Sequence, residues 1–365
     1  MPGLDLFKEA ERQLTICNSC RYCEGYCPVF PAIELRRSFS QGDVLYLSNL
    51  CHDCRACLYA CMYSPPHEFS INIPKLMSDV RIASYKRWSW PPILANSFTN
   101  RRVNVLLAVF VTLLVALLSV ICVDHRALFA VHLGPGAFYQ VVPYIAMVLP
   151  GSLLFIYGVA IWIRGGIRFW SETTTPLSKP IRVKAVIAAV KDAVTLTYLK
   201  GGGPGCFYPS SDTSSVRRIY HALTFWGFLS AFASTIFAAV YQEFFHWLPP
   251  YSFLSAPVIL GTAGGIGMIV GTTGLIWFKI NGDPTPAAAG ATGIDYIFLV
   301  TLGLAALSGL LTLVLRNSSA MGITLTLHLA LVAALFICAP YGKFVHVVYR
   351  FLALVRNRVE PPSSR

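Results

Sequence analysis

The stretch Cys17–Cys61 decides how this chain is organised. Its first part, Cys17–Pro28, reads CNSCRYCEGYCP, and its last part, Cys51–Cys61, reads CHDCRACLYAC. Both parts have the spacing C-x2-C-x2-C-x3-C, so eight cysteines gather in one short segment. Proline follows the first run directly but comes only after three further residues in the second. Two sets of thiols with the same spacing indicate two sites of the same kind.

This repeated spacing is the signature of the bacterial two-cluster ferredoxins. Three cysteines spaced by two residues wrap one face of an iron–sulfur cluster, while the fourth points away and reaches the neighbouring cluster. We therefore predict two [4Fe-4S] clusters with crossed ligands. By position, the first cluster takes Cys17, Cys20, Cys23 and Cys61. The second takes Cys51, Cys54, Cys57 and Cys27.

Two other uses of these cysteines are disfavoured. Structural zinc knuckles also contain C-x2-C pairs, but zinc gives no reason for the C-x3-C extension that both runs share. A disulfide framework is disfavoured because the chain opens without a secretory signal peptide and the cysteines cluster at ferredoxin spacing. Iron–sulfur ligation is the interpretation that explains the whole pattern.

The composition is that of a membrane protein. The 365 residues are 55% hydrophobic and only 13% charged, with a mean hydropathy of +0.59, which is too apolar for an ordinary soluble chain. The net charge of +12 does not indicate nucleic-acid binding, because the basic residues are not gathered on a soluble module with aromatic platforms.

Six apolar runs have about the 20 residues that a membrane-spanning helix needs. They cover residues 103–123, 141–163, 219–241, 256–278, 294–315 and 323–347. The predicted fold is mainly α, a six-helix transmembrane bundle with an N-terminal helical, ferredoxin-like cytoplasmic domain that holds two [4Fe-4S] clusters. Its parts are the cluster domain (1–80), an interfacial linker (81–102), the membrane domain (103–350, with a cytoplasmic loop at 164–218) and a cytoplasmic tail (351–365).

The basic residues predict the topology. Of 29 Lys and Arg, 12 lie in residues 1–102, nine in the loop 164–218 and five from Lys343 onward. Cytoplasmic segments carry such an excess, so both termini and the cluster domain are predicted to be cytoplasmic, in a bacterial inner membrane. Within the loop, Ile181–Leu199 predicts an amphipathic helix on the membrane or packed under the cluster domain. The glycine-rich turn at residues 201–205 does not match a phosphate-binding loop.

Histidines within spanning helices are functional candidates. His221 begins the third run and His346 ends the sixth, so both come to the cytoplasmic level, whereas His328 lies near the outer face. His328 and His346 stand about 27 Å apart along a helix, so one haem cannot use both. We predict that His221 and His346 ligate a b-type haem with no open coordination site.

The other histidines are weaker candidates. His328 is either a ligand of a second haem or a structural residue, and a second haem needs a partner from His246, His125 or His132. His52 and His67 lie beside the cysteines. Each could donate a hydrogen bond to a cluster ligand or lie on the solvated surface.

Three motifs resemble the tricarballylate/citrate utilisation protein B family over nearly the whole chain. They are CHDCRACLYACMYSPPHEF (51–69), GGGPGCFYP (201–209) and PYGKFVH (340–346). The spacing of His328 and His346 opposite His221 also looks similar to the cytochrome b subunit of membrane nitrate reductase, which has two haems. Ala231 stands ten residues after His221, where that subunit has its second ligand.

The resemblance implies a membrane redox protein, the quinone-reducing component of an oxidoreductase. It would reoxidise the reduced flavin of a soluble FAD-dependent dehydrogenase that oxidises tricarballylate or a similar polycarboxylate. Electrons would pass through the clusters and haem b to a quinone near the cytoplasmic leaflet. Beside His346, Lys343 and Tyr341 could bind a quinone carbonyl or a haem propionate, although a lysine that snorkels to the headgroups also fits Lys343.

Two other functions remain open. The chain could be the membrane subunit of another respiratory or heterodisulfide-reductase-like complex, which would need the same cofactors. It could also be a redox-sensing transporter, which ionisable groups near the membrane midplane would favour. Asp295 and Glu243 instead fall at the ends of the predicted helices.

Overall fold

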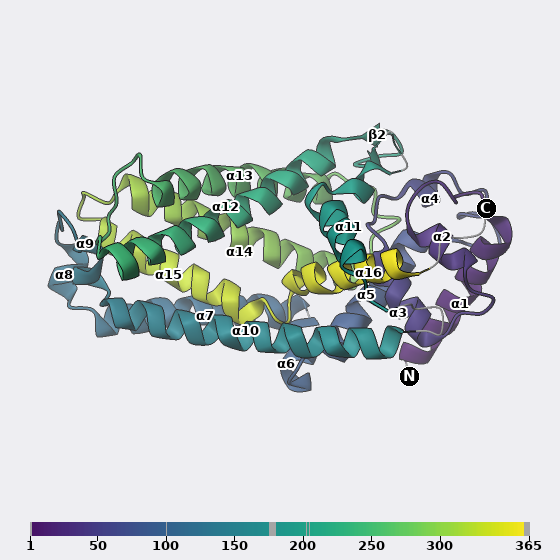
Figure 1. The fold of residues 1–365 in the computed structure, drawn as a ribbon, viewed down its shortest axis with the longest axis horizontal. Coiled ribbons are helices and arrows are strands. Elements are labelled where there is room, and N and C mark those ends of the chain that lie inside the picture. The colour runs from purple at the N-terminus through teal and green to yellow at the C-terminus, as the bar shows by residue number, and fades with distance from the viewer. Residues whose placement is uncertain (1, 100, 175–179, 202, 204, 361–365) are drawn as a thin grey trace.

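The computed structural model describes residues 2–99, 101–174, 180–201, 203 and 205–360. It is elongated, with a bundle of long helices at one end and the cysteine-bearing N-terminal part at the other (Figure 1). We call helices α1 to α5 the cysteine domain. These are α1 (Pro2–Cys20), α2 (Val29–Glu34), α3 (Gln41–Leu50), α4 (Ala56–Tyr59) and α5 (Ile73–Trp88).

The remaining elements form the bundle and its connections. Short or peripheral helices are α6 (Pro92–Thr99), α8 (His125–Phe129), α9 (Ala137–Val141), α11 (Val183–Val194), η1 (Thr197–Lys200), η2 (Lys343–Val345) and α16 (His346–Val359). The long helices are α7 (Arg101–Cys122), α10 (Tyr144–Thr173), α12 (Val216–Phe245), α13 (Ala256–Ile280), α14 (Ala289–Val314) and α15 (Met321–Cys338). Strands β1 (Cys206–Phe207) and β2 (Thr213–Ser214) pair antiparallel.

Five of the long helices in the described part of the chain, α10 and α12 to α15, are long and apolar enough to cross a membrane. Their outward side chains are apolar and uncovered, as lipid contact requires. On α10, for example, Ile145, Ile156 and Ile167 are each more than 60% exposed. Helix α7 coincides with the first predicted span and lies beside α14 and α15. Some of its side chains lie outside the described residues, so the count of six stays a prediction.

Helices α10 and α12 are longer than the sequence predicts. Each has 30 residues, which is about 45 Å of rise against about 30 Å of hydrocarbon. The end of α10 therefore reaches the cysteine domain, where Glu172 accepts a hydrogen bond from Trp88 Nε1 at 2.9 Å. Gly42 at the start of α3 lies directly on this helix end, since a Cβ there would stand 2.3 Å from the Glu172 carbonyl oxygen.

Helices α12 and α13 approach closely because glycines face one another. A Cβ on Gly264 would lie 2.6 Å from the Gly227 carbonyl oxygen, and a Cβ on Gly227 would lie 2.8 Å from that of Gly264. Such contacts let two backbones pack with no side chain between them. The glycine-rich sequence of the fourth predicted span thus serves the packing of this helix pair.

The sixth predicted span, 323–347, is not one helix. Helix α15 ends at Cys338, and α16 begins a new helix at His346. The cause is Pro340, which has no N–H to donate and clashes with the preceding turn. The chain turns instead through hydrogen bonds from the Tyr341 and Gly342 N–H groups to the Cys338 carbonyl. His346 therefore sits at the start of a helix, and the continuous 27 Å of rise from His328 does not exist.

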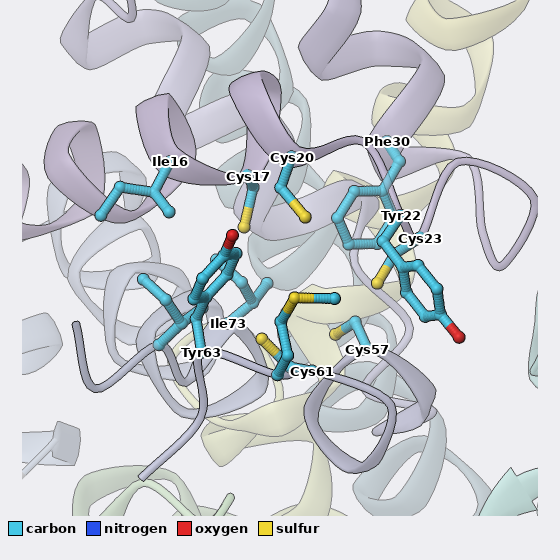
Figure 2. A pocket seen from close by; sticks show the side chains of 12 residues that line it. Ile16, Cys17, Cys20, Tyr22, Cys23, Phe30, Cys57, Cys61, Tyr63 and Ile73 are labelled. Carbon is cyan, nitrogen blue, oxygen red and sulfur yellow. The ribbon is translucent and has the colours of Figure 1, made fainter. Parts of the chain in front are cut away.

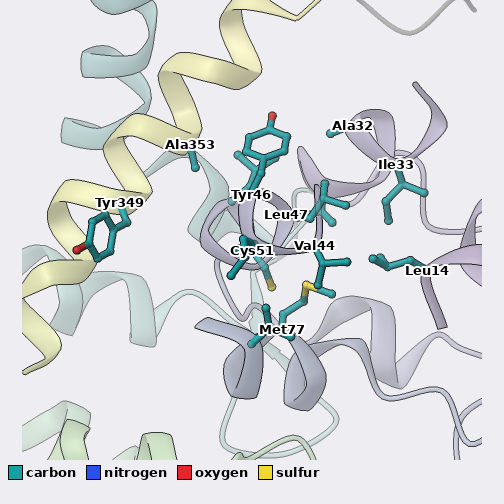
Figure 3. Close-up of a cluster of buried hydrophobic side chains, with 14 of the residues drawn as sticks. Leu14, Ala32, Ile33, Val44, Tyr46, Leu47, Cys51, Met77, Tyr349 and Ala353 are labelled. Carbon is teal, nitrogen blue, oxygen red and sulfur yellow. The ribbon is translucent and has the colours of Figure 1, made fainter. Parts of the chain in front are cut away.

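The cysteine domain shares one hydrophobic core with later parts of the chain (Figure 3). Leu14, Val44 and Met77 from its own helices are fully buried with Tyr349 and Ala353 of α16. Residues 351–359, predicted to begin a tail, thus complete this core. The predicted linker 81–102 likewise contains the end of α5, all of α6 and the first residues of α7. The predicted amphipathic helix is α11, which packs against α16.

A buried ion network joins α16 to the cysteine domain. Arg36 contacts Asp43 at 2.6 Å and Glu360 at 2.5 Å. Arg356 contacts Glu360 at 3.2 Å and Asp43 at 3.6 Å, and all four side chains are at most 7% exposed. The Tyr46 hydroxyl donates to Glu360 at 3.2 Å. Each charge is compensated only while the others are present.

Replacing one member of this network should therefore lower the free energy of unfolding more than the removal of a surface ion pair does. We expect Glu360→Ala to lower the free energy of unfolding of the cysteine domain by about 3–5 kcal/mol, because two arginines lose a buried partner. Urea unfolding of the detergent-solubilised protein would measure it. The control is Arg87→Ala, which removes a half-exposed pair with Glu172 and should cost about 1 kcal/mol or less. Equal costs for both variants would contradict the network's role.

Candidate functional site

The first group of cysteines surrounds a small pocket near the surface, the outer cysteine pocket. It is lined by Cys17, Cys20, Cys23 and Cys61, and by Cys57 (Figure 2). The first three lie at or just after the end of α1, and Cys61 follows α4. Cys20 is exposed. The fold thus brings the last cysteine of the second run to the first three of the first run.

The second group lines a deeper pocket, the inner cysteine pocket. Its cysteines are Cys27, Cys51, Cys54 and Cys57. Here the last cysteine of the first run joins three of the second, so the two groups have the crossed membership that the ferredoxin pattern predicts. Cys51 and Cys54 are 7% and 6% exposed. The inner pocket is therefore the better shielded of the two.

Several of these thiols resist losing their protons. Burial, with repulsion from neighbouring thiolates, raises the pKa of Cys17, Cys23 and Cys54 to about 12. These thiols stay protonated at neutral pH unless a metal replaces the protons. Among the described residues, no three Cys, His, Asp or Glu side chains converge closely enough to hold a single metal ion.

A larger cavity lies between the cysteine domain and the long helices, and we call it the histidine cavity. It is lined by both His221 of α12 and His346 of α16. Nδ1 of His346 lies 2.5 Å from the Lys343 carbonyl oxygen. A carbonyl only accepts, so Nδ1 carries the proton and Nε2 keeps its lone pair. Nδ1 of His221 is buried and has no hydrogen-bond partner in the described part of the chain.

Arginines connect this cavity to the inner cysteine pocket. Arg81 and Arg350 both line the cavity, and both donate to the main-chain carbonyl of Cys51, at 2.6 and 2.9 Å. Arg217 also lines it and donates to the Asp53 carbonyl at 2.6 Å. The loop that holds the inner cysteines is therefore tied directly to the cavity wall.

Lys343 and Tyr341 occupy different places. Lys343 lines the histidine cavity and contacts Asp295 at 2.7 Å, and Asp295 also contacts Lys279 at 2.5 Å. Lys343 therefore makes a partly buried ion pair inside the protein, which a lysine that snorkels to the headgroups would not. Tyr341 does not line this cavity. Its hydroxyl lies 2.5 Å from that of Tyr157 and donates to the Trp90 carbonyl at 3.1 Å, on the side of α10.

Several residues near the inner pocket were missed from the sequence. The glycine-rich turn leads into strand β1, where the Phe207 N–H donates to the Cys54 carbonyl at 3.0 Å. The Tyr208 ring has the Arg55 and Arg217 guanidinium groups 3.6 and 4.6 Å from its centre. Phe207 and Tyr208 therefore pack against the loop that carries Cys54 and Arg55. The spacing of the motif at residues 201–209 does not show which part of the chain it contacts.

The remaining histidines are dispersed. His52 lines both the inner cysteine pocket and the histidine cavity, and burial holds its pKa well below the usual value, so its ring is neutral. His67 stacks edge-on with Tyr63. His328 lines a further cavity at the far end of the bundle. His132 bonds to Gln140 and to the Ala127 carbonyl, His125 begins α8, and His246 caps α12.

The pockets form a continuous series because neighbours share wall residues. Cys57 lines both cysteine pockets. His52 and Asp53 line both the inner cysteine pocket and the histidine cavity. A group bound in one pocket would be separated from the next by a single layer of protein. Such a series suits stepwise electron transfer.

Comparison with known proteins gives separate matches for the cysteine domain and for the rest of the chain. Residues 10–87 match the family model of the citrate utilization protein B Fer4-like domain, and residues 97–365 match the model of citrate utilization protein B. The citrate utilization protein B of Escherichia coli is 40% identical over 353 residues, which cover 96% of this chain and 92% of that protein. No solved structure matches the chain.

The crossed grouping of the cysteines predicts different outcomes for two double variants. Cys20→Ser with Cys61→Ser removes two ligands from the outer pocket only, so about four of about eight iron atoms should remain. Cys20→Ser with Cys27→Ser removes one ligand from each pocket and should disturb both clusters. Iron analysis and electron paramagnetic resonance of the reduced proteins would measure this. If the second variant kept one cluster and the first variant kept none, the crossed arrangement would be contradicted.

Proposed function

The chain belongs to the citrate utilization protein B family, and we propose that it carries electrons from a soluble dehydrogenase to membrane quinone. The donor is the reduced flavin of a partner that oxidises tricarballylate or a similar polycarboxylate. The observation that supports this most is the series of pockets from the outer cysteines to the bundle. A transporter has no need of two thiol-lined sites connected in this way to a histidine-lined cavity.

The cysteine residues fit two [4Fe-4S] clusters. The N-terminal region is a Fer4-like domain by its family match. Five cysteines line the outer pocket and four line the inner one, with Cys57 common to both walls. The Phe207 N–H, which donates to the Cys54 carbonyl, helps to hold the loop of the inner site in place. Each bound cluster would accept and release one electron at a time.

The histidine cavity fits a b-type haem. His346 offers Nε2 with its ring held by the Lys343 carbonyl, and His221 has a buried nitrogen without a partner among the described residues. Two histidines leave a haem iron no open site, so the group would supply one-electron transfer and no ligand chemistry. Arg350, whose Nε is also buried without a partner in the described chain, provides positive charge for the propionates.

We further propose that electrons enter at the outer cysteine pocket. Cys20, Tyr22 and Met62 of its wall are exposed, the latter two by 59% and 60%. The inner pocket shares wall residues with the histidine cavity instead. A docked flavoprotein therefore meets the outer site first, and the inner site passes electrons toward the bundle.

The proposed setting is the bacterial inner membrane with both termini in the cytoplasm. The excess of Lys and Arg in residues 1–102 and 164–218 supports that orientation. In the fold, α11 from the second of these segments packs against α16 under the cysteine domain. The basic segments thus gather at one end of the bundle, where a soluble donor would reach the exposed cysteines.

The haem ligands can be tested by spectroscopy. We expect His221→Ala and His346→Ala each to abolish the b-type absorbance of the reduced protein, because each removes one axial ligand. The control is His246→Asn, at the exposed end of α12, which should keep the full absorbance. Unaltered spectra in both alanine variants would refute the assignment of these ligands.

The direction of electron entry can be tested with the variants of the cysteine pockets. In the Cys20→Ser, Cys61→Ser protein, the reduced dehydrogenase should no longer reduce the inner cluster, although dithionite still does. In a Cys27→Ser, Cys54→Ser protein, the dehydrogenase should still reduce the outer cluster but not the haem. Stopped-flow absorbance with tricarballylate and the partner flavoprotein would follow both. Rapid enzymatic reduction of the inner cluster in the first variant would reverse the proposed order.

A further inference from the structure

A second large cavity lies inside the bundle, which we call the end cavity. It lies between α9, α10 and α12 to α15, and α9 stands at the end of the bundle away from the cysteine domain (Figure 1). Much of its wall consists of small residues such as Ala231, Gly261, Ala305 and Ala306. Three helices with small side chains, α12, α13 and α14, leave room for a ligand that leucine side chains would fill.

His328 is the histidine in the wall of this cavity, and its ring is held in one orientation. Nδ1 lies 3.1 Å from both the Ala305 carbonyl oxygen and Ser308 Oγ. The carbonyl requires a proton on Nδ1, which leaves Nε2 as an acceptor. The ring packs on Gly309, where a Cβ would stand 2.9 Å from its Cε1. Both hydrogen bonds of His328 in the described structure use Nδ1, so Nε2 is available to a ligand.

The end cavity continues the series of pockets. Phe228 and Leu302 line both this cavity and the histidine cavity, so one layer of side chains separates their contents. Near the helix ends the wall becomes polar, with Gln242, Tyr251 and Arg316, and Arg316 donates to the Tyr251 carbonyl at 2.7 Å. The cavity is therefore apolar in the middle, with one fixed imidazole, and polar at the far end.

We propose that the end cavity is the quinone site and that Nε2 of His328 binds an oxygen of the quinone ring. This rests on the proposed function and moves the quinone away from Lys343 and Tyr341. Lys343 is paired with Asp295, and Tyr341 faces α10. A quinone suits the cavity because it has an apolar body and chain, with ring oxygens as its only polar groups. The small residues accommodate the ring, and the shared wall gives it access to electrons.

The chemistry balances with the proposed donor. One quinone takes two electrons, which originate in the reduced flavin, and two protons, and it leaves as a quinol. Both protons come from water at the polar end of the cavity. The neutral His328 ring keeps its proton on Nδ1, against the Ala305 carbonyl, and its Nε2 accepts a hydrogen bond from the hydroxyl group that forms on the quinol. His328 thus contacts the oxygen that becomes protonated.

A second haem is the competing occupant. No second histidine lines the cavity in the described chain, and Ala231 occupies the wall of α12 instead. Met268 is a wall residue with a sulfur that could ligate iron, so the haem content of the variants must be part of the test. The quinone explains a single oriented imidazole without requiring a partner ligand.

The experiment uses the full protein in lipid nanodiscs, reduced with dithionite and mixed with the short-chain quinone ubiquinone-1. The absorbance of the clusters and haem follows reoxidation, and pyridine haemochrome analysis gives the haem content. We expect His328→Leu to slow reoxidation about tenfold, as the loss of one hydrogen bond predicts, with unchanged haem content. Ala306→Phe, which fills the cavity, should slow it at least as much.

The matched control is Leu307→Phe, because Leu307 follows Ala306 on α14 but is 44% exposed on the outer surface. It should reoxidise at the wild-type rate. Wild-type rates in both cavity variants, or a fall in haem content in His328→Leu, would overturn the proposal. If Ala306→Phe loses haem through misfolding, His328→Leu alone decides. Failure of the wild-type protein to react with the quinone would instead refute the proposed function.

Discussion

The main-chain carbonyl of Cys51 is the point on which the arrangement depends. It accepts from Arg81 of the cysteine domain and from Arg350 of α16, and both arginines also line the histidine cavity. One oxygen therefore connects a predicted cluster ligand, the helix that begins with His346 and the wall of the next pocket. The proposed electron transfer would weaken steeply with distance, so it would need a cysteine domain that does not move relative to the cavity. Two charge-assisted hydrogen bonds fix this loop against the cavity wall.

Much of the site could be predicted because its chemistry is local in the sequence. The cysteine spacing is a regular pattern, and Cys27 and Cys61 come to the pockets that the pattern predicts. His221 and His346 share a cavity, although His346 reaches it at the start of α16 and not at the end of a long span. Hydropathy alone predicts one span over α15 and the start of α16, because the turn at Pro340 is short and its flanks are apolar.

What could not be predicted depends on contacts between distant residues. The burial of Arg36 against Glu360 joins positions 324 residues apart, and no spacing rule indicates such a pair. The contact of Phe207 with Cys54 and the pairing of Lys343 with Asp295 are of the same kind. Tyr341 is close to His346 in the sequence, yet the turn at Pro340 directs its side chain toward Tyr157 of α10. Proximity in sequence was a poor guide wherever the backbone changed direction.

The position of Glu360 also has a consequence for how the molecule is made. The cysteine domain precedes the long helices in the chain and would ordinarily fold before them, but its core includes Tyr349, Ala353 and Val359, which follow all the long helices. Until α16 is made the domain lacks a wall, and Arg36 and Asp43 lack Glu360. The long helices must therefore be in place before α16 can meet the cysteine domain and complete its core.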